Sequence, residues 1–148
     1  MSSTIPTAQD IAAELREAAA SSPAAMSSAI SARFAEKVEV AHEPALPLDG
    51  VIDRAFLIQS GTAEIAAFQR AMPDFKYEGE VSTDGDDVLA LMTMSGTASD
   101  GTAIAVTVPT TYTIKDGEIA RIKAEVDADA VTTLTKVLTS AGFEIPQE

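Results

Sequence analysis

Two segments near the start of the chain carry apolar residues at helical spacing. These residues are Ile11, Leu15 and Ala18 in the first segment, and Met26, Ile30 and Phe34 in the second. Thr7 and Asp10 precede the first segment and resemble a capping box, the paired side-chain signal of a helix start. Ser22-Pro23 separates the segments, and proline suits the first helical position because its missing N–H has no partner there. The pattern therefore predicts two N-terminal helices.

The middle of the chain is less regular. Residues 38–43 alternate apolar and polar side chains, which predicts a short strand. Residues 44–60 stay open, because 49–50 is an Asp-Gly turn signal and the apolar run 51–58 fits a short buried helix or a strand. A helix is predicted over 61–72, where Ile65, Phe68 and Met72 form one apolar stripe.

The second half of the chain alternates in four runs that three Asp-Gly pairs separate. The runs begin near Phe75, Val88, Thr102 and Ile119, and the pairs are Asp84-Gly85, Asp100-Gly101 and Asp116-Gly117. Asp-Gly suits hairpin turns because both residues tolerate positive φ angles. The pattern predicts an antiparallel meander of four strands. A helix over 128–141 follows, Gly142 ends it, and about six residues form a loose tail.

This order of elements predicts a single α+β domain over residues 1–148. A sheet of about five strands needs its apolar face covered, and the N-terminal helices can lie across it. We therefore expect a cone-shaped, curved antiparallel sheet with an open wide end and an apolar pocket inside.

Composition excludes several classes of function. The net charge is −13 and only 10 residues are basic, so binding to nucleic acid or to an anionic membrane surface is not expected. The absence of cysteine excludes disulfides, thiolate nucleophiles and Cys-type metal sites, and a single histidine excludes multi-histidine sites. No run approaches the ~20 apolar residues of a membrane helix. Charges interrupt the N-terminal alanine run, so no signal peptide is predicted and a cytoplasmic location is expected.

Several short strings resemble the SnoaL-like polyketide cyclase group of the nuclear-transport-factor-2-like superfamily. The strings are Phe68-Gln-Arg-Ala-Met-Pro-Asp-Phe75, Asp84-Gly-Asp-Asp-Val88, Ser95-Gly-Thr97, Asp116-Gly-Glu-Ile119 and the single Asp127. The resemblance spans residues 38–138. It implies a cone-shaped barrel, a homodimer through the outer face of the sheet, a pocket for a small hydrophobic molecule, and no required cofactor. Ala98 and Lys123 stand where many members of the group carry His and Trp.

Asp127 and His42 are the candidate catalytic residues. Asp127 matches an acidic position of the resemblance, and an Asp in an apolar cavity becomes a usable base because desolvation raises its pKa. The alternative is that Asp127 caps the C-terminal helix. His42, the only histidine, lies in phase with Val38 and Val40, from where it could relay a proton into a pocket.

Five further side chains are candidates for contact with a ligand. Lys123 could bind a carboxylate or form a Schiff base, or it could belong to a solvated face of its strand. Tyr77 and Tyr112 could donate a hydrogen bond to an oxyanion, or could simply pack in the core. Phe56 and Phe68 line either the core or the pocket. The acids of the turns lack the spacing of a calcium loop, so no metal site is predicted.

Two functions remain open from the sequence. One is a cofactor-independent enzyme of the cyclase, isomerase or dehydratase type, which performs general acid–base chemistry on a small hydrophobic carbonyl compound. The other is a non-catalytic module of the same fold that binds a small ligand or dimerises. The residues at Ala98 and Lys123 favour the second, and polar groups directed into the pocket would favour the first.

Overall fold

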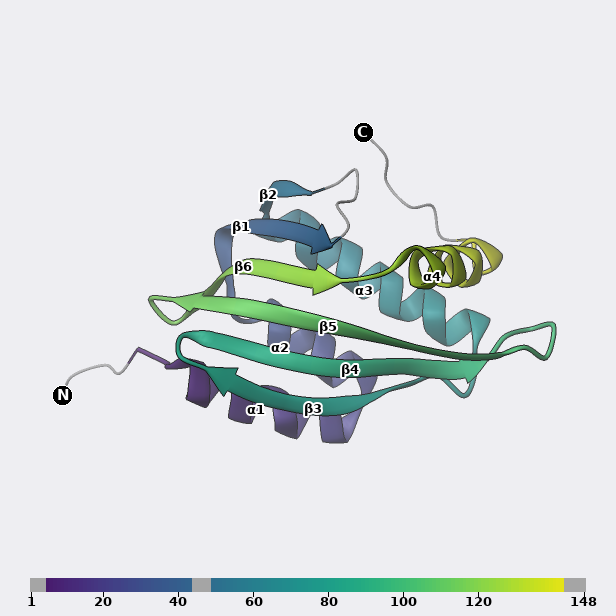
Figure 1. Ribbon diagram of the computed structural model, residues 1–148, viewed down its shortest axis with the longest axis horizontal. Coiled ribbons are helices and arrows are strands. Elements are labelled where there is room, and N and C mark those ends of the chain that lie inside the picture. The colour runs from purple at the N-terminus through teal and green to yellow at the C-terminus, as the bar shows by residue number, and fades with distance from the viewer. Residues whose placement is uncertain (1–4, 44–48, 143–148) are drawn as a thin grey trace.

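The computed structural model describes residues 5–43 and 49–142 (Figure 1). It contains the helices and strands α1 (Ala8–Ser21), α2 (Pro23–Ser31), β1 (Phe34–Glu43), β2 (Gly50–Asp53), α3 (Arg54–Ala71), β3 (Lys76–Asp84), β4 (Asp87–Thr97), β5 (Ala103–Lys115), β6 (Glu118–Glu125) and α4 (Ala128–Ser140). The strands form one curved sheet, and α1, α2 and α3 lie behind it in Figure 1. The predicted α+β class is confirmed. The C-terminal tail predicted from the sequence lies outside the described residues.

The two N-terminal helices begin at the predicted caps. The Thr7 hydroxyl accepts the Asp10 backbone N–H at 3.2 Å, and the Asp10 carboxylate accepts the Thr7 N–H at 3.0 Å. The Ser22 hydroxyl accepts the Ala25 N–H at 3.0 Å, with Pro23 at the first position of α2. A side-chain cap of this kind contributes about 1 kcal/mol to helix stability.

The predicted meander is present as β3 to β6. Asp116 and Gly117 both have positive φ angles, 54° and 78°, which is the backbone of a two-residue type I′ turn between β5 and β6. The β3–β4 turn is shifted by one residue, because Asp84 pairs with Asp87 and leaves Gly85-Asp86 at its centre.

Three predictions about the first half of the chain were wrong. The sheet has six strands in the order β2-β1-β6-β5-β4-β3, and β1 runs parallel to β6, so the sheet is mixed rather than antiparallel. Within the segment 44–60, for which the sequence favoured neither helix nor strand, β2 ends at Asp53 and α3 begins at Arg54. The predicted start of a helix at Gly61 was wrong, because α3 runs through this residue. Phe34, assigned to the second helix, begins β1 because α2 ends at Ser31.

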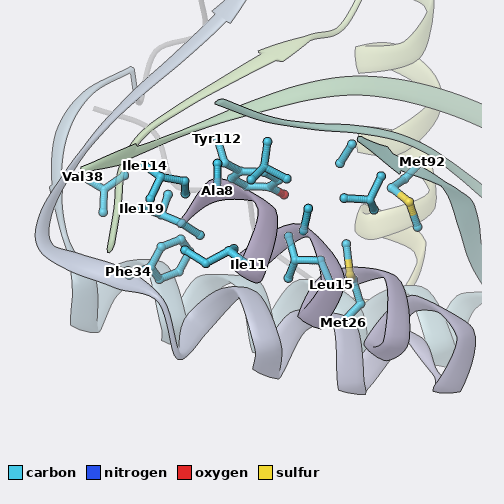
Figure 2. Packing of buried hydrophobic residues seen from close by; sticks show 14 of the residues in the cluster. Ala8, Ile11, Leu15, Met26, Phe34, Val38, Met92, Tyr112, Ile114 and Ile119 are labelled. Atoms are coloured by element: carbon cyan, nitrogen blue, oxygen red, sulfur yellow. The ribbon is translucent and has the colours of Figure 1, made fainter. Parts of the chain in front are cut away.

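Two apolar clusters hold the layers together. The larger one joins α1 and α2 to the sheet, where Ile11, Leu15 and Met26 are fully buried against Val38 and Ile119 (Figure 2). The smaller one joins the end of α3 to α4. In this cluster Phe68 stacks on Phe75 with ring centroids 5.3 Å apart, beside Met94 and Leu138.

Two of the sequence strings have a structural role at the narrow junction between α3 and β4. One Asp74 carboxylate oxygen accepts the Thr97 backbone N–H and the other accepts the Thr97 hydroxyl, both at 2.8 Å. These hydrogen bonds lower the pKa of Asp74 below its ordinary value. A Cβ atom at Gly96 would lie 3.0 Å from Met72, so this position has little room for a side chain. The strings therefore fix the turn after α3 to the end of β4.

Among the helices that the structure describes, none combines the length and the apolar composition that a membrane crossing requires.

Candidate functional site

An apolar pocket of about 440 Å³ lies between the sheet and the helices α2, α3 and α4. Its volume falls in the range of small-molecule sites, roughly 300–1,000 Å³. It contacts both apolar clusters, since Phe34 and Tyr112 belong to the larger one and Phe68 and Leu138 to the smaller. The pocket thus occupies the space that the two clusters leave between them.

Strand register determines which side chains reach this pocket. Alternate residues of a strand point to the same face of a sheet. Val40 pairs with Ile122, which pairs with Tyr112, and His42 pairs with Ala124 in the next row. All five line the pocket. The parallel pairing of β1 with β6 therefore carries His42 into the apolar interior.

Asp49 holds the His42 side chain in place. One Asp49 carboxylate oxygen lies 2.6 Å from His42 Nδ1, and the other accepts the His42 backbone N–H at 2.9 Å. Both side chains are mostly buried, with 24% and 18% of their surface exposed. A carboxylate on Nδ1 favours the tautomer with the proton on that nitrogen and leaves Nε2 as a proton acceptor. The pair thus has the arrangement of a base and the group that orients it.

Glu64 places a carboxyl group at the same pocket, from the middle of α3. Protein encloses this carboxyl, and the part of its surface that stays exposed faces the pocket. Burial raises the pKa of Glu64 above its ordinary value of 4.5, and the neighbouring His42 partly offsets this effect. Within residues 5–43 and 49–142, Glu64 makes no hydrogen bond or ion pair with another side chain. It therefore keeps its proton to a higher pH than an exposed glutamate does.

Two buried tyrosines extend this polar cluster. Burial, followed by the effect of Glu64, raises the pKa of Tyr77 to about 12. Burial and the neighbouring Tyr77 likewise raise the pKa of Tyr112 well above its ordinary value. Both phenols stay protonated over the physiological range, so each can donate a hydrogen bond to a ligand oxygen.

Five of the seven residues selected from the sequence line this pocket: His42, Phe56, Phe68, Tyr77 and Tyr112. Phe68 is fully buried, whereas Phe56 is 40% exposed near the start of α3. The structure thus brings one candidate catalytic residue and four candidate ligand contacts into one cavity.

Asp127 and Lys123 lie elsewhere. Asp127 is exposed and caps α4, where its carboxylate accepts the Ala130 N–H at 2.7 Å. This is the alternative that the sequence left open, and Asp127 is not among the residues that line the pocket with His42. Lys123 is exposed and pairs with Thr111 on the outer face of the sheet, because Ile122 and Ala124 occupy the inner face on either side of it.

Sequence reasoning missed Asp49 and Glu64. The turn signal accounted for Asp49 as part of an Asp-Gly pair, and nothing local indicated that it would contact His42. A signal for Glu64 was present, because Ser60, Glu64 and Phe68 are spaced four residues apart and share one helical face. All three line the pocket.

A second hollow, of about 500 Å³, lies between α1 and the edge strand β3. Arg16 Nε donates a hydrogen bond to the Val81 carbonyl there, at 2.8 Å. Its described lining includes the exposed acids Glu78 and Glu80 but no imidazole or phenol group, so the apolar pocket is the candidate site.

Solved structures similar to this chain share its fold at low sequence identity. An NTF2-like protein from Burkholderia thailandensis is 20% identical, with a TM-score of 0.62 over 88% of this chain and 98% of that one. A candidate polyketide cyclase from Acidithiobacillus ferrooxidans is 19% identical, with a TM-score of 0.60 over 92% and 99%. TerC, co-crystallised with polyporic acid, is 20% identical, with a TM-score of 0.58 over 85% and 98%. These likenesses establish the fold.

A comparison with curated proteins finds no match. Residues 18–122 match the SnoaL-like domain family, and this segment contains His42, Asp49, Glu64 and both tyrosines of the pocket. Since the match covers most of the chain, the protein belongs to the SnoaL-like domain family.

Proposed function

We propose that this protein is a cofactor-independent acid–base catalyst of the cyclase, isomerase or dehydratase type, acting on a small hydrophobic carbonyl compound. The observation that carries the proposal is the meeting of two proton-transfer groups at one apolar cavity. His42 is oriented by Asp49 at 2.6 Å, and Glu64 has a pKa raised by burial. A carboxyl group with a perturbed pKa beside a second titratable side chain in a cleft is typical of an active site.

The two groups have complementary roles in this proposal. His42 Nε2 removes a proton from the carbon next to the carbonyl, and the C–H electron pair forms the enol double bond. Protonated Glu64 gives its proton to the carbonyl oxygen, which receives the electron pair of the C=O bond. The reverse transfers, or transfer to a second carbon, return both residues to their first state. Asp49 stabilises the imidazolium formed on His42.

Hydrogen exchange in 2-tetralone tests the proposal without knowledge of the natural substrate. This neutral bicyclic ketone has exchangeable protons beside its carbonyl, and their replacement in heavy water is followed by NMR. We expect the wild-type protein to accelerate exchange above the buffer rate. The double variant His42→Gln, Glu64→Gln should show no acceleration, although the ketone should still bind. A wild-type protein that binds 2-tetralone without accelerating exchange would instead be a non-catalytic binding module.

We also propose a homodimer formed through the outer face of the sheet. An uncharged strip follows β4 and β5 on this face and consists of Leu89, Leu91, Thr93, Thr107, Pro109 and Thr111. Leu91 is 50% exposed. Acidic Glu78 and Glu80 border the strip on β3, and Lys123 borders it on β6. In a two-fold arrangement the acidic border of one copy can face the basic border of the other.

Leu91→Asp should convert such a dimer into a monomer, because it places a charge at the centre of an apolar contact between copies. Sedimentation velocity measures the change in mass. Val51→Asp is the matched control, since Val51 is 69% exposed on the edge strand β2, outside the strip. A monomeric wild-type protein, or a Leu91→Asp variant that remains dimeric, contradicts this interface.

A further inference from the structure

The titratable groups at the pocket, taken together with the Asp49 carboxylate that contacts His42, carry no net positive charge while Asp49 is ionised. Those that line it in the described part of the chain are His42, Glu64, Tyr77 and Tyr112, and no Lys or Arg joins them. Both phenols are neutral because their pKa values are raised. The Asp49 carboxylate at 2.6 Å balances His42 if the imidazole is protonated. The cluster is then neutral when Glu64 is protonated and negative when it is not.

Three arginines have partners away from the pocket. Arg33, which precedes β1, forms an ion pair with Glu14 of α1. Arg121 pairs with Glu39 at 3.1 Å, and Lys123 lies beside it on the outer face of the sheet. Arg16 donates to the Val81 carbonyl in the second hollow. Each of these side chains would have to leave its present position to reach a ligand in the pocket.

A carboxylate ligand would therefore enter a cavity that offers it no countercharge. Removing a carboxylate from water without a paired cation costs several kcal/mol in a protein interior. The net charge of −13 adds a longer-range repulsion of anions. An uncharged carbonyl group needs no countercharge. The Tyr77 and Tyr112 hydroxyls can donate hydrogen bonds to its oxygen, and Glu64 adds a third donor when it is protonated.

We propose that this pocket selects uncharged carbonyl compounds such as ketones and esters, and that Glu64 is the residue that rejects their carboxylate counterparts. This inference rests on the proposed function for the identity of the site, and adds the charge of the ligand. It also states the class of reaction that must precede this protein: any acid precursor has to be esterified, reduced or decarboxylated before it can bind.

A matched pair of probes tests the selectivity. 2-Acetylnaphthalene is a neutral ketone, and 2-naphthoate carries a carboxylate on the same ring system. Isothermal titration at pH 7.5 should show saturable binding of the ketone and binding of the carboxylate weaker by on the order of 100-fold, the factor expected for an unpaired charge in an apolar site. Equal affinity for the two probes would overturn the proposal, as would failure of the wild-type protein to bind the ketone.

Two variants test whether Glu64 is the residue that causes the selectivity against carboxylates. Glu64→Gln keeps the size of the side chain and should strengthen binding of 2-naphthoate at least tenfold, with ketone affinity changed by less than about threefold. Glu80→Gln is the control, because it removes one negative charge from the exposed edge strand β3. A similar gain in both variants would assign the effect to overall charge and contradict the role of Glu64.

Should Glu64→Gln fail to fold, the wild-type protein provides a second measurement. Lowering the pH from 8.5 to 6 protonates a larger fraction of Glu64, whose pKa burial raises, while 2-naphthoate stays ionised. The other titratable groups around Glu64 are His42, Asp49, Tyr77 and Tyr112, and none of them gains negative charge as the pH falls. Binding of 2-naphthoate should strengthen as the pH falls, and unchanged binding would contradict the proposal.

The outcomes for selectivity and for catalysis are separable. Ketone-selective binding without hydrogen exchange in 2-tetralone would leave the charge selection in place and remove the catalytic proposal. Exchange in 2-tetralone combined with equal binding of the two naphthalene probes would support the catalytic proposal and remove the charge selection.

Discussion

Replacing Glu64 with Gln will slow hydrogen exchange in 2-tetralone by roughly 10²–10⁴-fold, the usual contribution of one general acid or base. Gln keeps the shape of Glu and can still donate a hydrogen bond, but it has no proton to transfer. The loss should appear in the rate at saturating ketone and leave the affinity for ketone nearly unchanged. NMR exchange rates over a range of ketone concentrations separate these two quantities.

The pH dependence identifies which group the variant removes. Burial raises the pKa of Glu64, so the acid form persists above the ordinary value of 4.5 and is lost as the pH rises through the folded-state pKa. Wild-type exchange should therefore decline on the alkaline side. His42→Gln should keep this decline at a lower rate. The residual activity of Glu64→Gln should lack it, and a decline that persists in Glu64→Gln would assign the acid to another residue.

The raised pKa of Glu64 also makes the free energy of unfolding depend on pH in a defined direction. The folded state binds the Glu64 proton more tightly than the unfolded state does, so stability decreases as the pH rises from the ordinary value of 4.5 through the folded-state pKa. Glu64→Gln removes this dependence. In thermal melts, the midpoint temperature of the variant should rise relative to that of the wild-type protein as the pH is raised from 4.5 to 8. Because the change is an effect on the folded state alone, it does not depend on any substrate.

Local patterns in the sequence predicted the features that local interactions determine. The capping box at Thr7, the Ser22-Pro23 boundary and the hairpin at Asp116-Gly117 each depend on residues a few positions apart. The phase of His42 with Val40 also followed from alternation along one strand. These features together placed the sheet, its covering helices and one wall of the pocket.

Features that depend on distant residues were not predictable in the same way. Periodicity shows that residues 38–43 form a strand but not that this strand runs parallel to β6. The contact of Asp49 with His42 depends on the antiparallel pairing of β2 with β1. The alternation of apolar and polar residues does not predict which strands pair. Lys123 shows the converse, since its strand phase already indicated a solvated face, and its place in the pocket was suggested only by the chemistry open to a buried lysine.

Gly79→Ala should be the most destabilising single methyl addition in the sheet. Gly79 pairs with Met92 across β3 and β4, and a Cβ atom there would lie 2.0 Å from the Leu91 carbonyl oxygen and 2.8 Å from Met92 Cα. Both are main-chain atoms, which cannot rotate away as a side chain could. We expect a loss of roughly 3 kcal/mol or more in the free energy of unfolding, at the upper end of overpacking effects. Urea denaturation measures it.

Gly101→Ala separates this clash from the general effect of replacing a glycine. Gly101 has a φ angle of 89°, and no atom lies within 4 Å of the place that a Cβ atom would take, so its substitution involves backbone conformation alone. Its cost should be about 1–2 kcal/mol, the difference between left-handed and ordinary backbone for an L-residue. A Gly79→Ala variant no less stable than Gly101→Ala would show that β3 can shift away from β4 without loss.

The position of Gly79 connects this stability effect to the site. Tyr77, two residues earlier on β3, lines the pocket and pairs with Met94, which lines it as well. If the Gly79→Ala substitution forces β3 away from β4, the phenol of Tyr77 moves with the strand, and ketone binding should weaken even at temperatures where the variant is still folded. Gly101→Ala lies in the β4–β5 loop and should leave ketone affinity unchanged. Close approach of two main chains at Gly79 thus keeps a hydrogen-bond donor in place at the pocket.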